Sequence, residues 1–150
     1  MNVVILGCGR TGAALALNLS ASGHKVTVIE RSPESLRRLG KQYPCRIVLG
    51  NGLDVDVIEK AGVSEAQAFF ALTRGDNTNL MAAHIVRSKY PQVRVCVKVA
   101  DPQRAEAYRN MGLFCINPSG LLAGMCGDWL AGTPYKEIDK YNVLGKELEV

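Results

Sequence analysis

The apolar positions form short, continuous runs separated by longer segments with helical periodicity. The runs show little polar alternation, which is typical of parallel strands covered by helices on both faces. They predict six strands, at Val3–Leu6, Val26–Ile29, Arg46–Leu49, Ala68–Leu72, Val93–Val99 and Leu113–Ile116. Alternation of these strands with helices predicts a Rossmann-like, doubly wound α/β fold, with a six-stranded, mainly parallel sheet in the order 3-2-1-4-5-6 and helices on both faces.

Several residues mark the expected helix boundaries. Ser32 and Asp101 each precede a proline, and a polar N-cap followed by proline is typical of a helix start. Four glycines follow helical segments and indicate their ends: Gly23, Gly40, Gly62 and Gly112. A further helix is expected over Leu121–Leu130. The expected organisation is one domain over residues 1–132 and a polar tail over 133–150.

Composition narrows the class of protein. The 150 residues fit one domain, and 47% apolar with 21% charged residues is ordinary for a globular protein. No apolar run reaches membrane-spanning length and no basic leader precedes the first strand, so we expect a cytoplasmic protein. The net charge of +4 is dispersed and aromatic residues are only 6%, which argues against nucleic-acid binding. Five cysteines without a CxxC pair argue against zinc and disulfides.

The strongest chemical signal is a glycine motif that follows the first strand directly. Gly7-Cys8-Gly9-Arg10-Thr11-Gly12 has the pattern GxGxxG and leads into a small, apolar helix. In such a motif Gly7 permits the tight turn, Gly9 lets a pyrophosphate approach the backbone, and Gly12 lets the helix pack closely. The amino terminus of the helix then offers N–H groups to phosphate. The sequence predicts a site for NAD(H), ATP, ADP or AMP.

Glu30 ends the second strand at about the offset expected for a carboxylate that binds the ribose hydroxyls. Its charge disfavours the 2′-phosphate of NADP, although the adjacent Arg31 weakens this exclusion. The alternative is an exposed glutamate without a ligand. Arg10 is placed to contact phosphate oxygens or to face solvent. Cys8 lies near a helix start, which can lower a thiol pKa, but a small loop residue is all that the turn requires.

Polar turns after the later strands are expected at the same edge, because ligands of open α/β sheets bind at the carboxyl ends of the strands. Asn51 and Gly52 follow the third strand, and Lys98 lies near the end of the fifth. The fourth strand is followed by a polar run that could equally serve as helix caps. The candidates in this run are Leu72, Thr73, Arg74, Asn77 and Asn79.

Several of these segments occur in an order that resembles the RCK/KTN (Trk-N) domains of bacterial potassium-uptake proteins and K⁺ channels. The resemblance covers about residues 1–132. It rests on the glycine loop with its arginine, the acid of the second strand, Gly50–Asp54, Ala71–Asn79, Asp101-Pro102, Met111-Gly112 and Ile116–Pro118.

The resemblance implies a cytosolic regulatory module that binds NAD(H) or adenine nucleotides, forms dimers or larger rings, and acts on a membrane potassium channel or transporter. It would lie at the inner membrane through that partner. Phosphates would bind at Gly7, Gly9, Arg10 and Gly12, ribose at Glu30, adenine at Asn51, and the rest of the ligand at Thr73, Asn77 and Asn79. Such domains usually continue into a second lobe, so Leu121–Leu130 would be a crossover helix and Val143–Val150 the beginning of that lobe.

Two other functions remain open at this point. One is a small NAD-dependent oxidoreductase, although the sequence shows neither a substrate domain nor a Tyr-x-x-x-Lys pair. The other is a nucleotide-type fold that serves only as an interaction scaffold. We expect a regulatory, non-enzymatic protein without a metal site.

Overall fold

The computed structural model describes residues 1–141, except for the side chains of residues 138 and 139. The chain divides into two compact units, the first over Met1–Val97 and the second from Lys98 onward. The expected tail at 133–150 lies partly outside the described residues, and Val143–Val150 lies outside them entirely. In the described part of the chain, no helix has both the length and the apolar character needed to cross a membrane.

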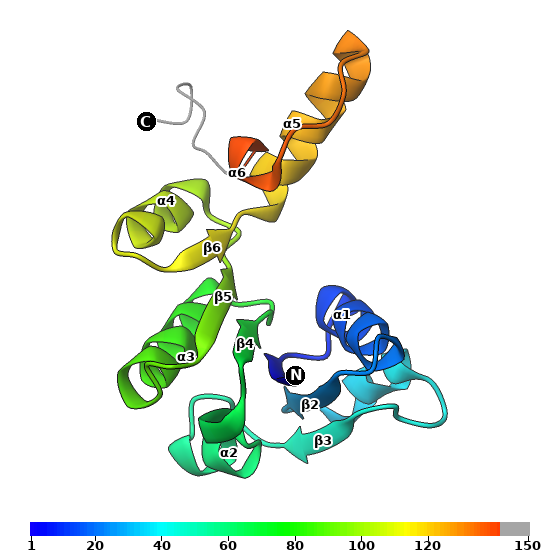
Figure 1. Cartoon of the computed structure of the whole chain (residues 1–150), viewed down its shortest axis with the longest axis vertical. Coiled ribbons are helices and arrows are strands. Elements are labelled where there is room, and N and C mark those ends of the chain that lie inside the picture. The colour runs from blue at the N-terminus through cyan, green and yellow to red at the C-terminus, as the bar shows by residue number, and fades with distance from the viewer. Residues whose placement is uncertain (142–150) are drawn as a thin grey trace. The chain divides into compact units, whose positions relative to one another are not determined.

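Six strands form one sheet, and their order confirms the expected fold (Figure 1). The strands are β1 (Asn2–Leu6), β2 (Lys25–Glu30), β3 (Arg46–Leu49), β4 (Ala68–Ala71), β5 (Arg94–Lys98) and β6 (Phe114–Ile116). They follow one another in space as β3-β2-β1-β4-β5-β6, and all pairings from β3 through β5 are parallel. The strand boundaries expected from the sequence are correct to within one residue.

The centre of the first unit is β1, which pairs with β2 on one side and β4 on the other. Val3, Val4, Ile5 and Leu6 are all nearly inaccessible to solvent, because both faces of the strand are covered. Val3 and Ile5 belong to a core cluster with residues of α1 (Arg10–Ala21). The continuous apolar run in the sequence therefore reflects burial on two faces.

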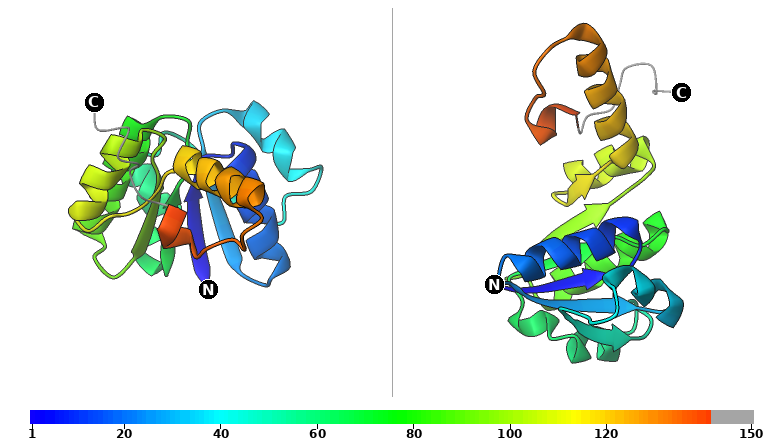
Figure 2. Two further views of the ribbon diagram at one scale, coloured as in Figure 1. Left: turned by 90° about the horizontal axis from the view of Figure 1, so that it is seen from above. Right: turned by 90° about the vertical axis from the view of Figure 1, so that its right-hand side faces the viewer.

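Helices cover both faces of the sheet in the first unit (Figures 1 and 2). They are α1, η1 (Pro33–Leu39), α2 (Val55–Lys60), η2 (Val63–Glu65) and α3 (Asp76–Lys89). The expected helix start at Ser32 is confirmed, because Ser32 is the N-cap and Pro33 opens the helix, but the segment is a 3₁₀ helix and the Ser32 side chain makes no capping hydrogen bond. The helix stops at Gly23, Gly40 and Gly62 are confirmed by positive φ angles of 81°, 87° and 80°.

The second unit contains α4 (Pro102–Asn110), α5 (Pro118–Ala131) and α6 (Ile138–Tyr141), together with β6. The expected cap at Asp101 is confirmed, because its carboxylate accepts a hydrogen bond from Arg104 N at 3.0 Å. The last long helix begins at Pro118 rather than at Leu121. Its cap is Asn117, whose side-chain oxygen accepts from Gly120 N.

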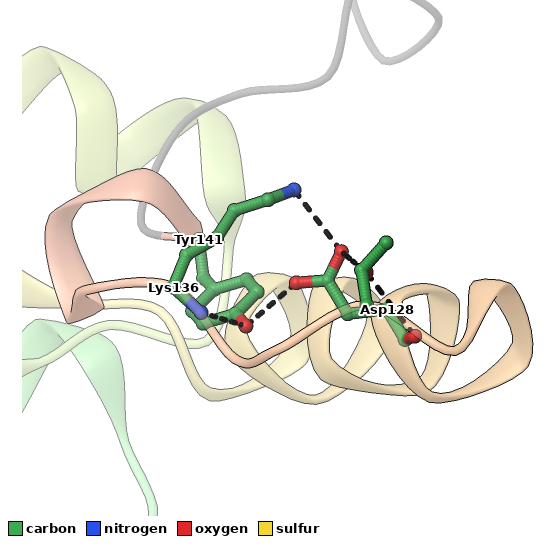
Figure 3. Close-up of polar contacts among 4 residues, drawn as sticks. Asp128, Lys136 and Tyr141 are labelled. Atoms are coloured by element: carbon green, nitrogen blue, oxygen red, sulfur yellow. Dashed lines mark hydrogen bonds and ion pairs between the residues drawn. The ribbon is translucent and has the colours of Figure 1, made fainter.

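A polar cluster joins α6 to the end of α5 (Figure 3). The Asp128 carboxylate accepts hydrogen bonds from the Tyr141 hydroxyl at 2.7 Å and from Thr133 Oγ1 at 3.2 Å, and it pairs with Lys136 Nζ at 3.1 Å. The Tyr141 bond and then the Lys136 bond hold the pKa of Asp128 below its ordinary value. The charge of Asp128 is thus compensated within the second unit.

Candidate functional site

The glycine loop connects β1 to α1, and two of its three glycines are required by the backbone itself. Gly7 has φ +100°, and a Cβ there would lie 3.0 Å from Thr73 N. A Cβ on Gly12 would lie 1.9 Å from the Gly7 carbonyl oxygen. Gly7 N donates to Ile29 O at 2.8 Å, which ties the turn to β2. Gly7 and Gly12 therefore shape the loop.

Gly9 differs from the other two glycines, because a Cβ at this position would meet no atom within 4 Å. Gly9 is the N-cap of α1 and has extended backbone; no described side chain caps this helix, and its first turn contains no acid. The first N–H groups of an α-helix have no partner within the helix and carry partial positive charge. The open space beside Gly9 thus faces a surface that favours an anion.

Glu30 lies beside this loop at the end of β2, as expected from the sequence. Glu30 Oε2 accepts from Cys8 N at 2.6 Å, and Oε1 accepts from Arg31 N and Ser32 N, each at 2.8 Å. A carboxylate has about four lone-pair positions, and the residue is only half-buried. Glu30 therefore braces the glycine loop and keeps capacity for a hydroxyl donor from a ligand.

The Cys8 side chain points away from the open face of the loop and into the core cluster, where its exposure is 0%. Burial, and then the charge of Glu30, raise the pKa of the Cys8 thiol to about 11. The suggestion that the helix start lowers this pKa is wrong, because desolvation of a thiolate outweighs the helix field. Only the backbone of Cys8 faces the site, and its N–H is bound to Glu30.

The turn after β3 lies against the end of β1. A Cβ on Gly52 would lie 2.2 Å from Leu6 Cδ1, so the turn needs glycine for close packing. Gly50 N donates to Glu30 O at 3.0 Å. The exposed Asn51 uses its side-chain oxygen to accept from Leu53 N at 3.2 Å. Its contact with adenine stays a prediction.

The turn after β4 joins the same edge through backbone contacts. Leu72 N donates to Leu6 O at 2.9 Å, and the backbone of Thr73 lies close to the backbone of Gly7. The side chains of Arg74 and Asn77 are exposed, whereas Leu72 is nearly buried and Asn79 has 0% exposure. Because the Asn79 side chain is fully buried, a ligand at the surface does not reach it in this structure.

Three further candidates have exposed side chains at this edge of the first unit: Arg10, Thr11 and Arg31. Lys98 is the first residue of the second unit, so the structure does not place it relative to the glycine loop.

The structure also reveals a hollow of about 430 Å³ lined by Ser32, Glu34, Ser35, Arg37 and Arg38. In the sequence the two arginines suggest only a solvated helix face, and no local motif signals the hollow.

A doubly wound sheet with this glycine turn defines the Rossmann-like class of α/β domains. Within that class, the model of the TrkA-N domain matches residues 3–117, and the chain belongs to this family. The resemblance to Trk-N domains inferred from the sequence is thereby confirmed.

The Trk system potassium uptake protein TrkA of Streptomyces coelicolor is 46% identical over 113 residues, which cover 75% of this chain and 51% of that protein. The chain spans about half the length of the curated relatives that it matches.

Two solved structures share the fold. The Kef C-terminal domain of Shewanella denitrificans in its AMP-bound form has a TM-score of 0.74 at 21% identity, with 95% of this chain and 89% of that chain covered. The GsuK channel bound to NAD has a TM-score of 0.68 at 23% identity, with 82% of this chain and 22% of that chain covered. At these identities the likeness concerns the fold alone.

Proposed function

We propose that this chain is a regulatory nucleotide-binding domain or subunit that controls potassium transport through a membrane channel or transporter. Its ligand is NAD(H) or an adenine nucleotide, namely ATP, ADP or AMP. The observation that carries the proposal is the open space beside Gly9, at the uncapped start of α1 and next to the Glu30 carboxylate. An anion gains from the helix start, and a ribose hydroxyl gains from a carboxylate.

The names of the similar proteins support both parts of this proposal. The TrkA relative is named as a potassium-uptake protein, and the structural neighbours are described with AMP and with NAD. In our proposal the phosphates bind the backbone at Gly9–Gly12 with help from Arg10. Glu30 binds the ribose, Asn51 borders the adenine, and Thr73 with Asn77 borders the rest of the ligand.

Regulation requires a ligand that binds two arrangements of the protein with different affinity. We propose that this chain forms a homodimer or a larger ring, that nucleotide binding shifts the relation between its copies, and that the membrane protein responds to that shift. The protein would then act in the cytoplasm at the inner membrane. The exposed apolar side chains of α5 support self-association, because large apolar groups in one stripe mark interaction surfaces.

The proposed site is tested by Gly9→Asp, measured by calorimetric titration with ADP and with NAD. The Cβ of an aspartate at position 9 would meet no atom within 4 Å, and its carboxylate would repel phosphates at the start of α1. We expect binding to fall by about 100-fold or more, with an unchanged circular dichroism spectrum. Asn18→Asp adds the same charge to an exposed position of α1 and serves as the control. Wild-type affinity in Gly9→Asp would reject the site.

We further propose that the domain has no enzymatic role. Hydride transfer needs a proton donor and a substrate pocket that face the nicotinamide. The decisive measurement is NADH absorbance during incubation of the protein with NAD and a panel of simple alcohols and hydroxy acids. Turnover with any of them would favour the oxidoreductase instead.

A further inference from the structure

Asn79 is a polar side chain with no solvent exposure, in the first turn of α3. Burial of an amide is unfavourable unless its donors and acceptors are bonded. A residue that only faced a ligand pocket would be accessible when the pocket is empty. The position of Asn79 therefore calls for a role within the protein.

The Asn79 carboxamide binds Thr73 through three contacts. Its Oδ1 accepts from Thr73 N at 2.8 Å and from Thr73 Oγ1 at 2.6 Å, and its Nδ2 donates to Thr73 O at 3.2 Å. The backbone strengthens this connection, because Asn79 N donates to Gly75 O at 3.0 Å. Both backbone groups of Thr73 and its hydroxyl are thus held by one side chain from α3.

Thr73 in turn forms the wall behind the glycine loop. A Cβ on Gly7 would lie 3.0 Å from Thr73 N and 3.1 Å from Thr73 Cα, so the two backbones are in close contact. A shift of Thr73 changes the space in which Gly7 holds its φ of +100°. Gly7 leads into the N-cap Gly9, where the first N–H groups of α1 have no partner within the helix and the space beside the backbone is open.

We propose that Asn79 is a positioning residue for the phosphate-binding loop, an inference that rests on the proposed nucleotide-binding function. Asn79 touches no ligand. It holds Thr73 against Gly7, and this contact keeps the N–H groups of residues 9–12 oriented toward a phosphate. Errors of about 1 Å in the position of such donors reduce binding or rate by up to about 100-fold. Loss of Asn79 should therefore weaken the phosphate contribution to affinity more than the adenosine contribution.

The test compares ADP with adenosine, because the two ligands differ only in the phosphates. Calorimetric titration gives the ratio of the adenosine Kd to the ADP Kd for wild type, Asn79→Ala and Asn79→Asp. We expect this ratio to fall about tenfold in Asn79→Ala, while the adenosine Kd changes less than about threefold. Asn79→Asp keeps an acceptor for Thr73 N and Oγ1 but lacks the donor for Thr73 O, and its ratio should lie between the other two.

Met81→Ala is the matched control, because Met81 lies on the same helix with 55% of its surface exposed. It should leave the ratio unchanged. A purely structural role of Asn79 would lower the melting temperature and weaken both ligands in proportion, so the ratio would stay at the wild-type value and overturn the inference. If Asn79→Ala does not fold, Asn79→Asp decides by the same criterion. If wild type does not bind ADP, the ratio is measured by the same criterion with whichever of AMP, ATP or NAD it does bind. Absence of binding to all four nucleotides would instead reject the proposed function, and the inference with it.

Discussion

The orientation of Cys8 leads to a prediction about thiol reactivity. Its thiol has a pKa of about 11 in the folded protein, raised by burial, against an ordinary value of 9.0. Iodoacetamide at pH 8 should therefore modify the exposed Cys126 and leave Cys8 unmodified until the protein is unfolded. Mass spectrometry of the labelled peptides gives the answer. Rapid modification of Cys8 in the native protein would contradict the buried position.

The same pKa shift gives the thiol a pH-dependent effect on stability. Because the folded pKa is higher than the unfolded pKa, Cys8 contributes its full stabilisation below pH 9. That contribution is lost as the pH rises through about 11, since only the unfolded chain loses the thiol proton readily. The Cys8→Ala variant should show a shallower decrease of stability between pH 9 and 11 in urea titrations. Equal slopes for the two proteins would reject the assignment.

The sequence predicts single residues well where the requirement is local. Gly7 and Gly12 follow from spacing within one strand-turn-helix unit, Glu30 follows from its offset at the end of the next strand, and the structure places all three at one loop. Cys8 and Asn79 lie in segments that the sequence also identifies as site candidates, yet their side chains are buried in the protein. That direction depends on the packing of α1, β4 and α3, and no pattern within the motif encodes it.

Helix starts show the same dependence at the scale of elements. Ser32 and Asp101 have similar sequence contexts and both are N-caps, but only the Asp101 side chain accepts a capping hydrogen bond. At the first site, Ser35 N, which a Ser32 side chain would cap, donates to the Ser32 carbonyl oxygen at 3.1 Å, as in a 3₁₀ turn. The competing acceptor is the backbone carbonyl of the cap residue itself, and the sequence of the cap motif does not reveal that the helix is of the 3₁₀ type.

Asn117 caps α5 and also binds two carbonyl groups of the second unit, so its substitution should be strongly destabilising. Its Oδ1 accepts from Gly120 N, and its Nδ2 donates to Val99 O at 3.0 Å and to Ala100 O at 2.8 Å. Asn117→Ala removes the cap and also the side-chain bonds to the carbonyl groups of Ala100 and of Val99, which is fully buried. We expect a loss of about 3 kcal/mol of unfolding free energy, against about 1 kcal/mol for Asp101→Ala.

Urea denaturation followed by circular dichroism measures both values, and hydrogen exchange at the first turn of α5 localises the effect. Asp101→Ala is the matched control, since Asp101 is an exposed cap in the same unit whose side chain accepts a capping bond from Arg104 N. Equal losses in the two variants would mean that the bonds to Val99 and Ala100 contribute little.

At the scale of the whole molecule, the sheet order was accessible from the sequence because six apolar runs alternate with helical segments, and parallel strands joined by helices have few topologies. The division at Val97 was not accessible, because it depends on the density of contacts on each side of β5. The sequence predicts that the domain ends at residue 132, where the regular alternation of apolar strands and helical segments ends.

Self-association is a property of the whole molecule, and α5 gives it a specific surface. Leu122, Met125 and Trp129 are spaced three and four residues apart, so they share one helix face, and they are 66%, 38% and 73% exposed. The single charged residue of this helix, Asp128, is turned into the cluster with Tyr141. The face therefore carries no charge of its own to keep two copies apart.

Trp129→Asp should weaken the proposed homodimer by about 30-fold or more, because a tryptophan at the centre of an interface commonly contributes about 2 kcal/mol or more. Sedimentation velocity over a concentration series would show the variant as a monomer where the wild type is dimeric. Tyr43→Asp, at an exposed aromatic position of the first unit, should leave the dimer intact. A wild type that stays monomeric at every concentration would reject self-association, whereas a dimer that tolerates Trp129→Asp would move the interface away from α5.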